Sequence, residues 1–247
     1  MADPSASRAP GAGGAGPGPA FVAIGVVLLL VGSYRGLAVA PPETFMGEVQ
    51  RIMYVHVPTA WNAMLTLTFA FGCALMFLFR EDWKWDSRME AAVEVGVVLS
   101  ALLCMQGAIW AKPTWGVWWD WDPRLTTTAV MVFLFAGILA LRRFVDDPLK
   151  RATWSAVAVV IAFVDVPIVY FSVRWWNSLH QLQSTPETVS SVFHWPLRIN
   201  AFGVLFLMIG LVSMRARIAG LRLRGELAPP LPEPPAAREL AAREAGA

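Results

Sequence analysis

The stretch WAKPTWGVWWDWDPRLT, residues 110–126, holds five of the chain's 12 tryptophans together with Lys112, Asp120, Asp122 and Arg124. Tryptophan is large, rigid and aromatic, so such a dense group forms an extended apolar surface. The spacing is neither helical nor alternating, so no simple amphipathic element accounts for it. The simplest alternative is an aromatic belt at a membrane boundary, but a belt needs only one or two tryptophans per helix end. We therefore interpret residues 110–126 as a platform for a ligand.

The chain around this stretch is too apolar for a soluble domain. Of its 247 residues, 56 % are hydrophobic and 15 % are charged, whereas soluble domains have about 25 % charged residues. Six apolar stretches approach the ~20 residues that cross a bilayer. The sequence therefore predicts an all-α, polytopic membrane protein with six transmembrane helices, at residues 20–39, 59–79, 91–110, 127–141, 154–173 and 195–214. The mixed segment at 41–56 predicts a short helix lying along the membrane interface.

Composition and charge divide the chain into three parts. Residues 1–19 are rich in Pro, Gly and Ala and predict a disordered tail. Residues 20–215 form the transmembrane domain, and residues 216–247 form a basic, Pro/Ala-rich tail. Six spans leave both tails on one side, and this side, with the loops at 80–90 and 142–151, holds 14 of the 20 lysines and arginines. The positive-inside rule makes this side cytoplasmic and the tryptophan-rich loop periplasmic.

The chain has three histidines, His56, His180 and His194, and the predicted orientation puts all of them on the outer side. Two neutral imidazoles on opposite faces of an aromatic bed are what a haem iron requires. A zinc site needs three or four ligands at tetrahedral spacing, and the sequence has no HxH or HxxxH. A lone interfacial histidine is more often simply hydrogen-bonded. Several histidines on the face that carries the platform favour a haem site.

A haem also carries two propionates, which need cations. The cations available near the outer side are Arg51, Lys112, Arg124 and Arg174. Arginine can meet a carboxylate through two parallel hydrogen bonds. The alternative interpretation of these charges is a solvated loop.

Two aspartates have more than one interpretation. Asp122 is suited either to pair with Arg124 or to cap a helix that begins near Pro123. Asp165 is the only carboxylate deep in a predicted span. There it is either functional or bound to backbone groups that Pro167 frees.

Several other classes of protein are poorly supported. The sequence has no nucleophile elbow, P-loop or dinucleotide-binding glycine pattern, so we do not expect an enzyme. The basic residues are dispersed between apolar segments, which argues against binding to nucleic acid. Cys73 and Cys104 lie within apolar runs without CxxC spacing, so we expect both to be small buried side chains.

Three segments resemble those of one known family. WGVWWDWDPRLT at 115–126 resembles the tryptophan-rich WWD signature, WGxWWxWDxRLT, of the cytochrome c maturation protein C (CcmC, or haem exporter protein C) family. MYVHVP at 53–58 and WWNSLHQ at 175–181 resemble the two histidine-bearing outer loops of that family. The resemblance covers about residues 20–215, and it implies six helices and a non-enzymatic role in handling haem.

The resemblance also implies a site and partners. Haem b would be held transiently at the periplasmic face of the bacterial inner membrane, with His56 and His180 as axial ligands of its iron. The haem platform and chaperone contact would consist of Trp115, Gly116, Trp118, Trp119, Trp121, Asp122 and Arg124. Haem would pass to the haem chaperone CcmE, with CcmD and the CcmAB ABC transporter as further partners, for c-type cytochrome biogenesis. His194 matches no ligand of the family, and Asp120 stands where many relatives have an apolar residue.

Two other functions stay open at this point. A membrane b-type cytochrome also binds haem, although its ligands usually lie within the spans. A small-molecule permease is the other alternative, and Asp165 is its only support.

Overall fold

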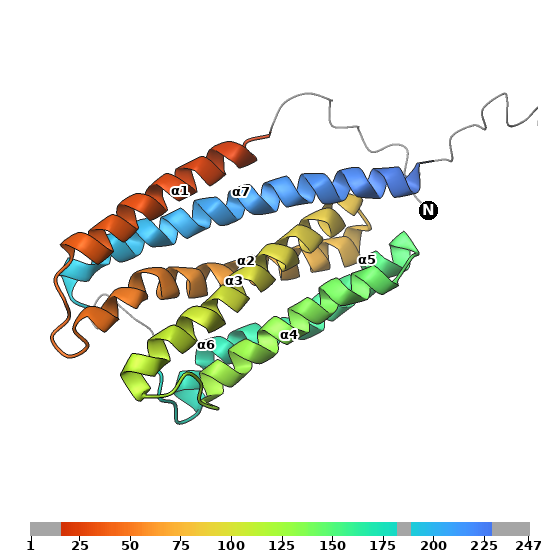
Figure 1. The fold of residues 1–247 in the computed structure, drawn as a ribbon. Helices are drawn as coiled ribbons and strands as arrows, with labels where there is room; N and C mark the ends of the chain where they lie inside the picture. Colours follow the sequence, from red (N-terminus) through yellow and green to blue (C-terminus); the bar gives the residue numbers. More distant parts are fainter. Residues whose placement is uncertain (1–15, 182–188, 229–247) are drawn as a thin grey trace, which may run out of the picture.

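The computed structural model describes residues 16–181 and 189–228, and within these ranges it contains α-helices and no β-strand. The seven α-helices pack as one elongated bundle (Figure 1). They are α1 Gly18–Tyr34, α2 Met53–Arg80, α3 Trp83–Trp115, α4 Pro123–Phe144, α5 Pro148–Ala162, α6 Asp165–Trp175 and α7 His194–Leu227. Six helical segments are long and apolar enough to cross a membrane. The prediction of an all-α fold with six such segments is confirmed.

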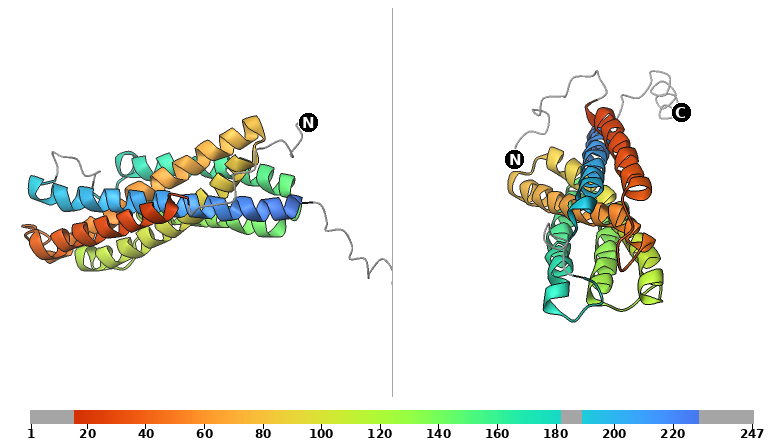
Figure 2. Two further views of the ribbon diagram at one scale, coloured as in Figure 1. Left: turned by 90° about the horizontal axis from the view of Figure 1, so that it is seen from above. Right: turned by 90° about the vertical axis from the view of Figure 1, so that its left-hand side faces the viewer.

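The bundle has two outer groups of helices and a centre. α1 packs along α7, and α4 packs against α5 and α6, while α2 and α3 lie between these groups (Figures 1 and 2). Glycines allow α1 and α7 to approach closely. A Cβ on Gly25 would lie 2.5 Å from the backbone nitrogen of Leu207, and a Cβ on Gly210 would lie 2.8 Å from the Gly18 carbonyl oxygen. Small residues of this kind are typical of closely packed membrane helices.

The fifth predicted span is broken into two helices. α5 ends at Ala162 and α6 begins at Asp165, although the sequence predicted one continuous helix over 154–173. Pro167 has no backbone N–H, and its ring would clash with the carbonyl of Phe163, four residues earlier. The N–H of Val166 instead donates to the Phe163 carbonyl, at 3.0 Å. Pro167 therefore accounts for the break between α5 and α6.

Of the helix predicted over 41–56, only residues 48–56 are helical, and the last of these already belong to α2. The chain forms a π-helical turn at Arg35–Val39, a 3₁₀ helix at Glu48–Ile52 and then the start of α2. Gly47 adopts a positive φ of 56°, which reverses the chain before the 3₁₀ helix. Arg51 Nη1 holds the reversal in place by donating to the carbonyls of Gly36, at 2.7 Å, and Ala40, at 2.9 Å.

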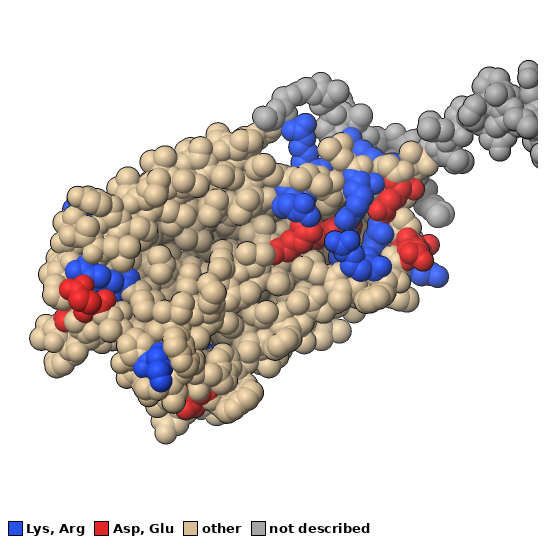
Figure 3. Space-filling model, in the orientation of Figure 1, with Lys and Arg blue, Asp and Glu red and all other residues tan. Residues whose placement is uncertain are grey.

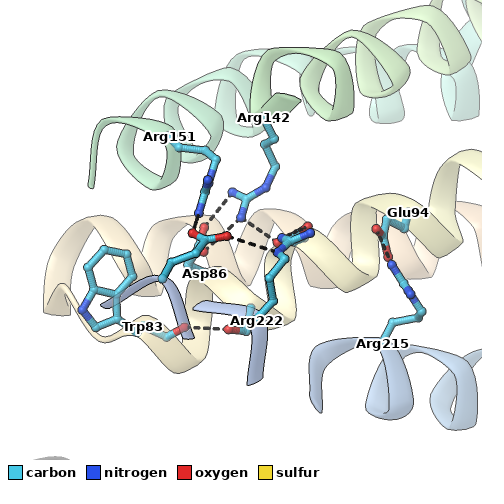
Figure 4. A network of polar contacts seen from close by, with 10 residues as sticks. Trp83, Asp86, Glu94, Arg142, Arg151, Arg215 and Arg222 are labelled. Carbon is cyan, nitrogen blue, oxygen red and sulfur yellow. Dashed lines mark hydrogen bonds and ion pairs between the residues drawn. The ribbon is translucent and has the colours of Figure 1, made fainter. Parts of the chain in front are cut away.

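One end of the bundle, which we call the arginine end, is held together by ion pairs. Arg142 on α4 is 7 % exposed. It donates to both oxygens of Asp86, at 2.8 and 3.1 Å, and to Glu90, at 2.7 Å (Figure 4). Further pairs join α3 and α5 to α7: Arg222 with Glu90, Arg215 with Glu94 and Arg151 with Glu226. On the face seen in Figure 3, most charged residues gather at this end.

The ion pairs also explain why α7 is longer than predicted. The sequence placed the end of the last span at 214, but α7 continues to Leu227. Arg215 and Arg222 fasten this continuation to α3. The remaining parts of the predicted tails, 1–15 and 229–247, lie outside the described residues.

Candidate functional site

His56 lies in the first turns of α2, at the opposite end of the bundle, which we call the histidine end. Its position depends on Pro58, which has no N–H and so leaves the Tyr54 carbonyl without its helical partner. Asn200 on α7 supplies that partner, because its Nδ2 donates to the Tyr54 carbonyl at 2.8 Å. Asn200 is fully buried. A side chain from α7 therefore fixes the turn that carries His56.

His180 lies in the loop after α6 and is fastened to the start of α4. The His180 N–H donates to Ser178 Oγ, at 3.0 Å. The Ser178 hydroxyl donates to Asp122 Oδ2, at 2.6 Å, and the Leu179 N–H donates to the same oxygen, at 2.7 Å. Asp122 Oδ1 accepts the Arg124 N–H, at 2.9 Å, so Asp122 caps α4 as one of its two interpretations predicted.

The two imidazoles lie opposite each other. The ring centres of His56 and His180 are 6.3 Å apart, and the ring planes differ by 19°. The Trp110 ring meets His56 edge-on, with centres 5.4 Å apart, and the Trp115 ring meets His180 in the same way, at 5.7 Å. His56 Nδ1 is buried and has no hydrogen-bond partner among the described residues. Burial and the nearby charge of Arg124 lower the pKa of His180 to about 4, with Asp122 opposing this shift. His180 is therefore neutral at pH 7.

Two clefts meet at this histidine pair. The larger has about 960 Å³ of empty space, including space open to solvent, and the smaller has about 520 Å³. Both are lined by His56, Gly107, Trp110, Leu125, His180 and Gln181. The larger cleft continues over Trp61, Met64, Met131 and Val169, and the smaller continues over Met46 and Trp115. The two histidines therefore lie where the two largely apolar clefts border each other.

The tryptophan-rich stretch is divided between the clefts and the surface. Trp110, Trp115 and Trp119 line one cleft or both. Trp118 is 58 % exposed and Trp121 is 79 % exposed, and neither lines a cleft. The Trp121 ring nevertheless contacts the Trp119 ring, with centres 6.0 Å apart, so the exposed tryptophans continue the surface that lines the larger cleft.

Gly116 ends α3 within the tryptophan-rich stretch. It adopts a positive φ of 82° at the C-cap of α3, a conformation that glycine adopts without strain. The Lys112 ammonium donates to the Gly116 carbonyl, at 2.8 Å. The chain can then turn between α3 and α4 within the few residues 116–122.

Four cations were predicted as partners for propionates, and all four lie within the described residues. Of these four, only Arg124 lines one of the two clefts. Its Nη2 donates to the Tyr170 carbonyl, at 3.1 Å, and its Nε is buried without a hydrogen-bond partner among the described residues. Arg51 and Lys112 are engaged by backbone carbonyls elsewhere. Arg174 lines neither cleft.

Three other residues singled out from the sequence also lie outside the clefts. His194 Nε2 is 2.8 Å from the Val189 carbonyl, and Asp120 is exposed. Asp165 lies at the break between α5 and α6, and its Oδ2 is buried without a partner among the described residues. None of these side chains is brought to the histidine pair.

Residues 15–227 match the family model described as heme exporter protein C. The chain belongs to the heme exporter protein C family. Relatives with this name include that of Haemophilus influenzae, 37 % identical over 209 residues, or 83 % of this chain and 85 % of the relative. Another is that of Bradyrhizobium diazoefficiens, 34 % identical over 212 residues, 83 % of this chain and 80 % of the relative. That of Escherichia coli K12 is 34 % identical over 194 residues, 78 % of this chain and 79 % of the relative.

Within this member of the family, the sequence did not reveal two residues that hold the imidazole-bearing segments in place. Ser178 follows the WWN sequence and Asn200 lies within an apolar helix, so neither belongs to a recognisable ligand pattern. A polar residue in a predicted span was the available signal for Asn200, because such residues usually have a partner in a neighbouring helix. Ser178 had no comparable signal.

Proposed function

We propose that this protein binds haem at the histidine end and takes part in haem export for c-type cytochrome biogenesis. The observation that carries the proposal is the spacing of His56 and His180. Metal–imidazole bonds are about 2 Å long and the nitrogen lies about 1 Å from the ring centre, so a metal held between two imidazoles sets their centres about 6 Å apart. The observed 6.3 Å matches this separation, and ligation would require each of the two nearly parallel rings to turn one nitrogen toward the iron.

The surroundings of the pair suit a haem b that is cargo rather than a resident cofactor. The two clefts leave apolar space beside the imidazoles, with Trp115 and Trp119 as aromatic walls. Arg124 provides a cation for a propionate, and Gly116 and Asp122 shape the loops around the site. The neutral state of His180 leaves a lone pair available for iron. The chain would bind haem through its iron and its propionates. Binding and release of a cargo require no catalytic step.

We propose that the histidine end faces the periplasm and both termini face the cytoplasm of a bacterial inner membrane. The distribution of lysine and arginine supports this orientation, because basic residues favour the cytoplasmic side. The exposed Trp118 and Trp121 would then face the haem chaperone CcmE, with CcmD and the CcmAB transporter as further partners. The relatives' name, heme exporter protein C, supports an export role.

Titration of the purified full-length chain with haem tests the proposal. We expect a Soret band that saturates, and a large loss of haem affinity in His56→Ala and in His180→Ala. His194→Ala is the matched control, because His194 lines neither cleft, and it should bind haem like the parent. Unchanged titrations in both His56→Ala and His180→Ala would overturn the proposal.

Transfer distinguishes haem export from a b-type cytochrome. His180 lies outside the spans and His56 is close to the end of one, which favours release at the membrane surface. We expect haem to leave the loaded protein when the soluble domain of the haem chaperone is added, as followed by absorption after the two proteins are separated. Haem that stays bound at excess chaperone would instead indicate a resident cytochrome.

A further inference from the structure

The Asp122 carboxylate joins two segments that are far apart in the sequence. It is 4 % exposed. One oxygen caps α4 through the Arg124 N–H, and the other accepts from Ser178 Oγ, at 2.6 Å, and the Leu179 N–H, at 2.7 Å. Burial raises the pKa of Asp122, but the hydrogen bonds from Ser178, Leu179 and α4 outweigh it, so that the pKa lies below its usual range. The group is an ionised acceptor, and hydrogen bonds to ionised groups are the stronger class.

Ser178 passes this connection on to His180. Its hydroxyl donates to Asp122 and at the same time accepts the His180 N–H, at 3.0 Å. The hydroxyl therefore lies between the carboxylate of the WWD motif and the backbone of the histidine. A methyl group in its place can make neither contact.

We propose that Ser178 is a positioning residue for haem: with Asp122 it holds His180 at the distance from His56 at which one iron can bind both. This inference rests on the proposed ligation by the two histidines. Partners that bond to the side chain of a metal ligand orient it, and their loss typically lowers metal affinity about 10- to 100-fold. Ser178 bonds to the backbone of His180, so we expect a loss at the lower end of this range. Asp122 of the WWD motif would thus influence iron binding through its hydrogen bonds to Ser178 and Leu179, in addition to the contribution of the tryptophan rings.

The test uses the full-length protein in detergent with haem, and compares Ser178→Ala with Ser178→Thr. We expect Ser178→Ala to bind haem about 10-fold more weakly, the lower end of the range for residues that orient a metal ligand. Part of its ferric haem should become five-coordinate and high-spin, because His180 no longer reaches the iron reliably. Ser178→Thr keeps the hydroxyl and should restore the six-coordinate, low-spin spectrum. Added free imidazole should restore the same spectrum in Ser178→Ala.

Ser191→Ala is the matched control, because Ser191 is an exposed serine at the same end of the bundle. It should leave haem affinity and spin state unchanged. A Ser178→Ala protein with the haem affinity and low-spin fraction of the parent would overturn the positioning role.

Hydrogen exchange of the haem-free protein separates this inference from the proposed function. In Ser178→Ala the amides of Leu179 and His180 should exchange faster, while those within α4 should not change. If His180→Ala keeps the low-spin spectrum, the proposed ligation fails, and the exchange rates still report whether the connection exists. If exchange at Leu179 and His180 is the same in Ser178→Ala and the parent, the connection itself is refuted.

Discussion

The two ends of the bundle differ in how their buried charges are paired. At the arginine end, buried Arg142 meets two carboxylates, and further ion pairs join α3, α5 and α7. Arg142 Nε and Trp85 Nε1 are nevertheless buried there without partners among the described residues. At the histidine end, His56 Nδ1, Trp110 Nε1 and Arg124 Nε are buried without partners among the described residues, and their residues line open clefts. An unsatisfied buried polar atom costs about 1–3 kcal/mol. The arginine end therefore stabilises the helices, while the histidine end keeps groups available for a ligand.

The largest effect should come from breaking the arginine end. Arg142→Met leaves Asp86 and Glu90 buried without their shared cation, and removing one partner of a buried pair costs about 3–5 kcal/mol. We expect a much lower unfolding temperature in detergent, while the protein that stays folded keeps its haem spectrum. Arg143→Met is the control, because the neighbouring Arg143 is exposed. Equal unfolding temperatures for the two variants would contradict a stabilising role for the cluster.

At the histidine end, Arg124→Met should weaken haem binding without unfolding the protein. A hydrogen bond to a charged group contributes about 1.5–3 kcal/mol, so the haem Kd should rise about 10- to 100-fold. Haem dimethyl ester lacks the propionate charges, and the parent and the variant should bind it equally well. Lys112→Met should have little effect on either ligand. Equal losses for haem and its ester would show that Arg124 does not meet a propionate.

Asn200 tests how the His56 turn is held. Asn200→Leu leaves the Tyr54 carbonyl buried without a donor, which should cost about 1–3 kcal/mol and weaken haem binding. Adding Pro58→Ala returns a backbone N–H to the helix, so the double variant should recover part of the lost stability and affinity. Thermal unfolding and haem titration measure the two effects. A double variant no better than Asn200→Leu would refute the link between Pro58 and Asn200.

The smallest effect tests the division of the tryptophans. Trp121→Ala removes an outward-facing ring, and a surface substitution of this kind changes stability by no more than about 0.5 kcal/mol. Because Trp121 lines neither cleft, we expect haem affinity within about twofold of the parent, a change in binding free energy of about 0.4 kcal/mol. Trp119→Ala removes a ring that lines the larger cleft and should weaken haem binding clearly more. Equal losses in haem titrations of the two variants would favour one undivided platform.

Local patterns in the sequence were enough to predict the number of spans and one helix cap. The apolar runs predicted six spans, and an aspartate before a proline predicted the cap at Asp122, because both signals lie within a few residues. The break after Ala162 was missed, since the apolar run is continuous across it and only Pro167 marks it. The positions of the spans are local properties, whereas the break depends on a single proline and the length of α7 on ion pairs to α3.

Contacts between distant segments were beyond local patterns. Ser178 bonds to Asp122 across 56 positions, and Asn200 bonds to Tyr54 across 146. The Arg142 cluster likewise unites α3, α4 and α7. Hydrophobic periodicity identifies an element and its buried face, but the partner of a polar side chain depends on how the helices pack. The same holds for the exposure of Trp118 and Trp121, which no local pattern predicted.

Electron paramagnetic resonance of the ferric haem complex tests the central claim most directly. The full-length parent and His194→Ala should give the low-spin signal of an iron with two axial imidazoles. His56→Ala and His180→Ala should each give a high-spin signal, because one ligand is then missing. A low-spin signal that persists in both of these variants would contradict ligation by the pair, and so would a parent complex that is high-spin.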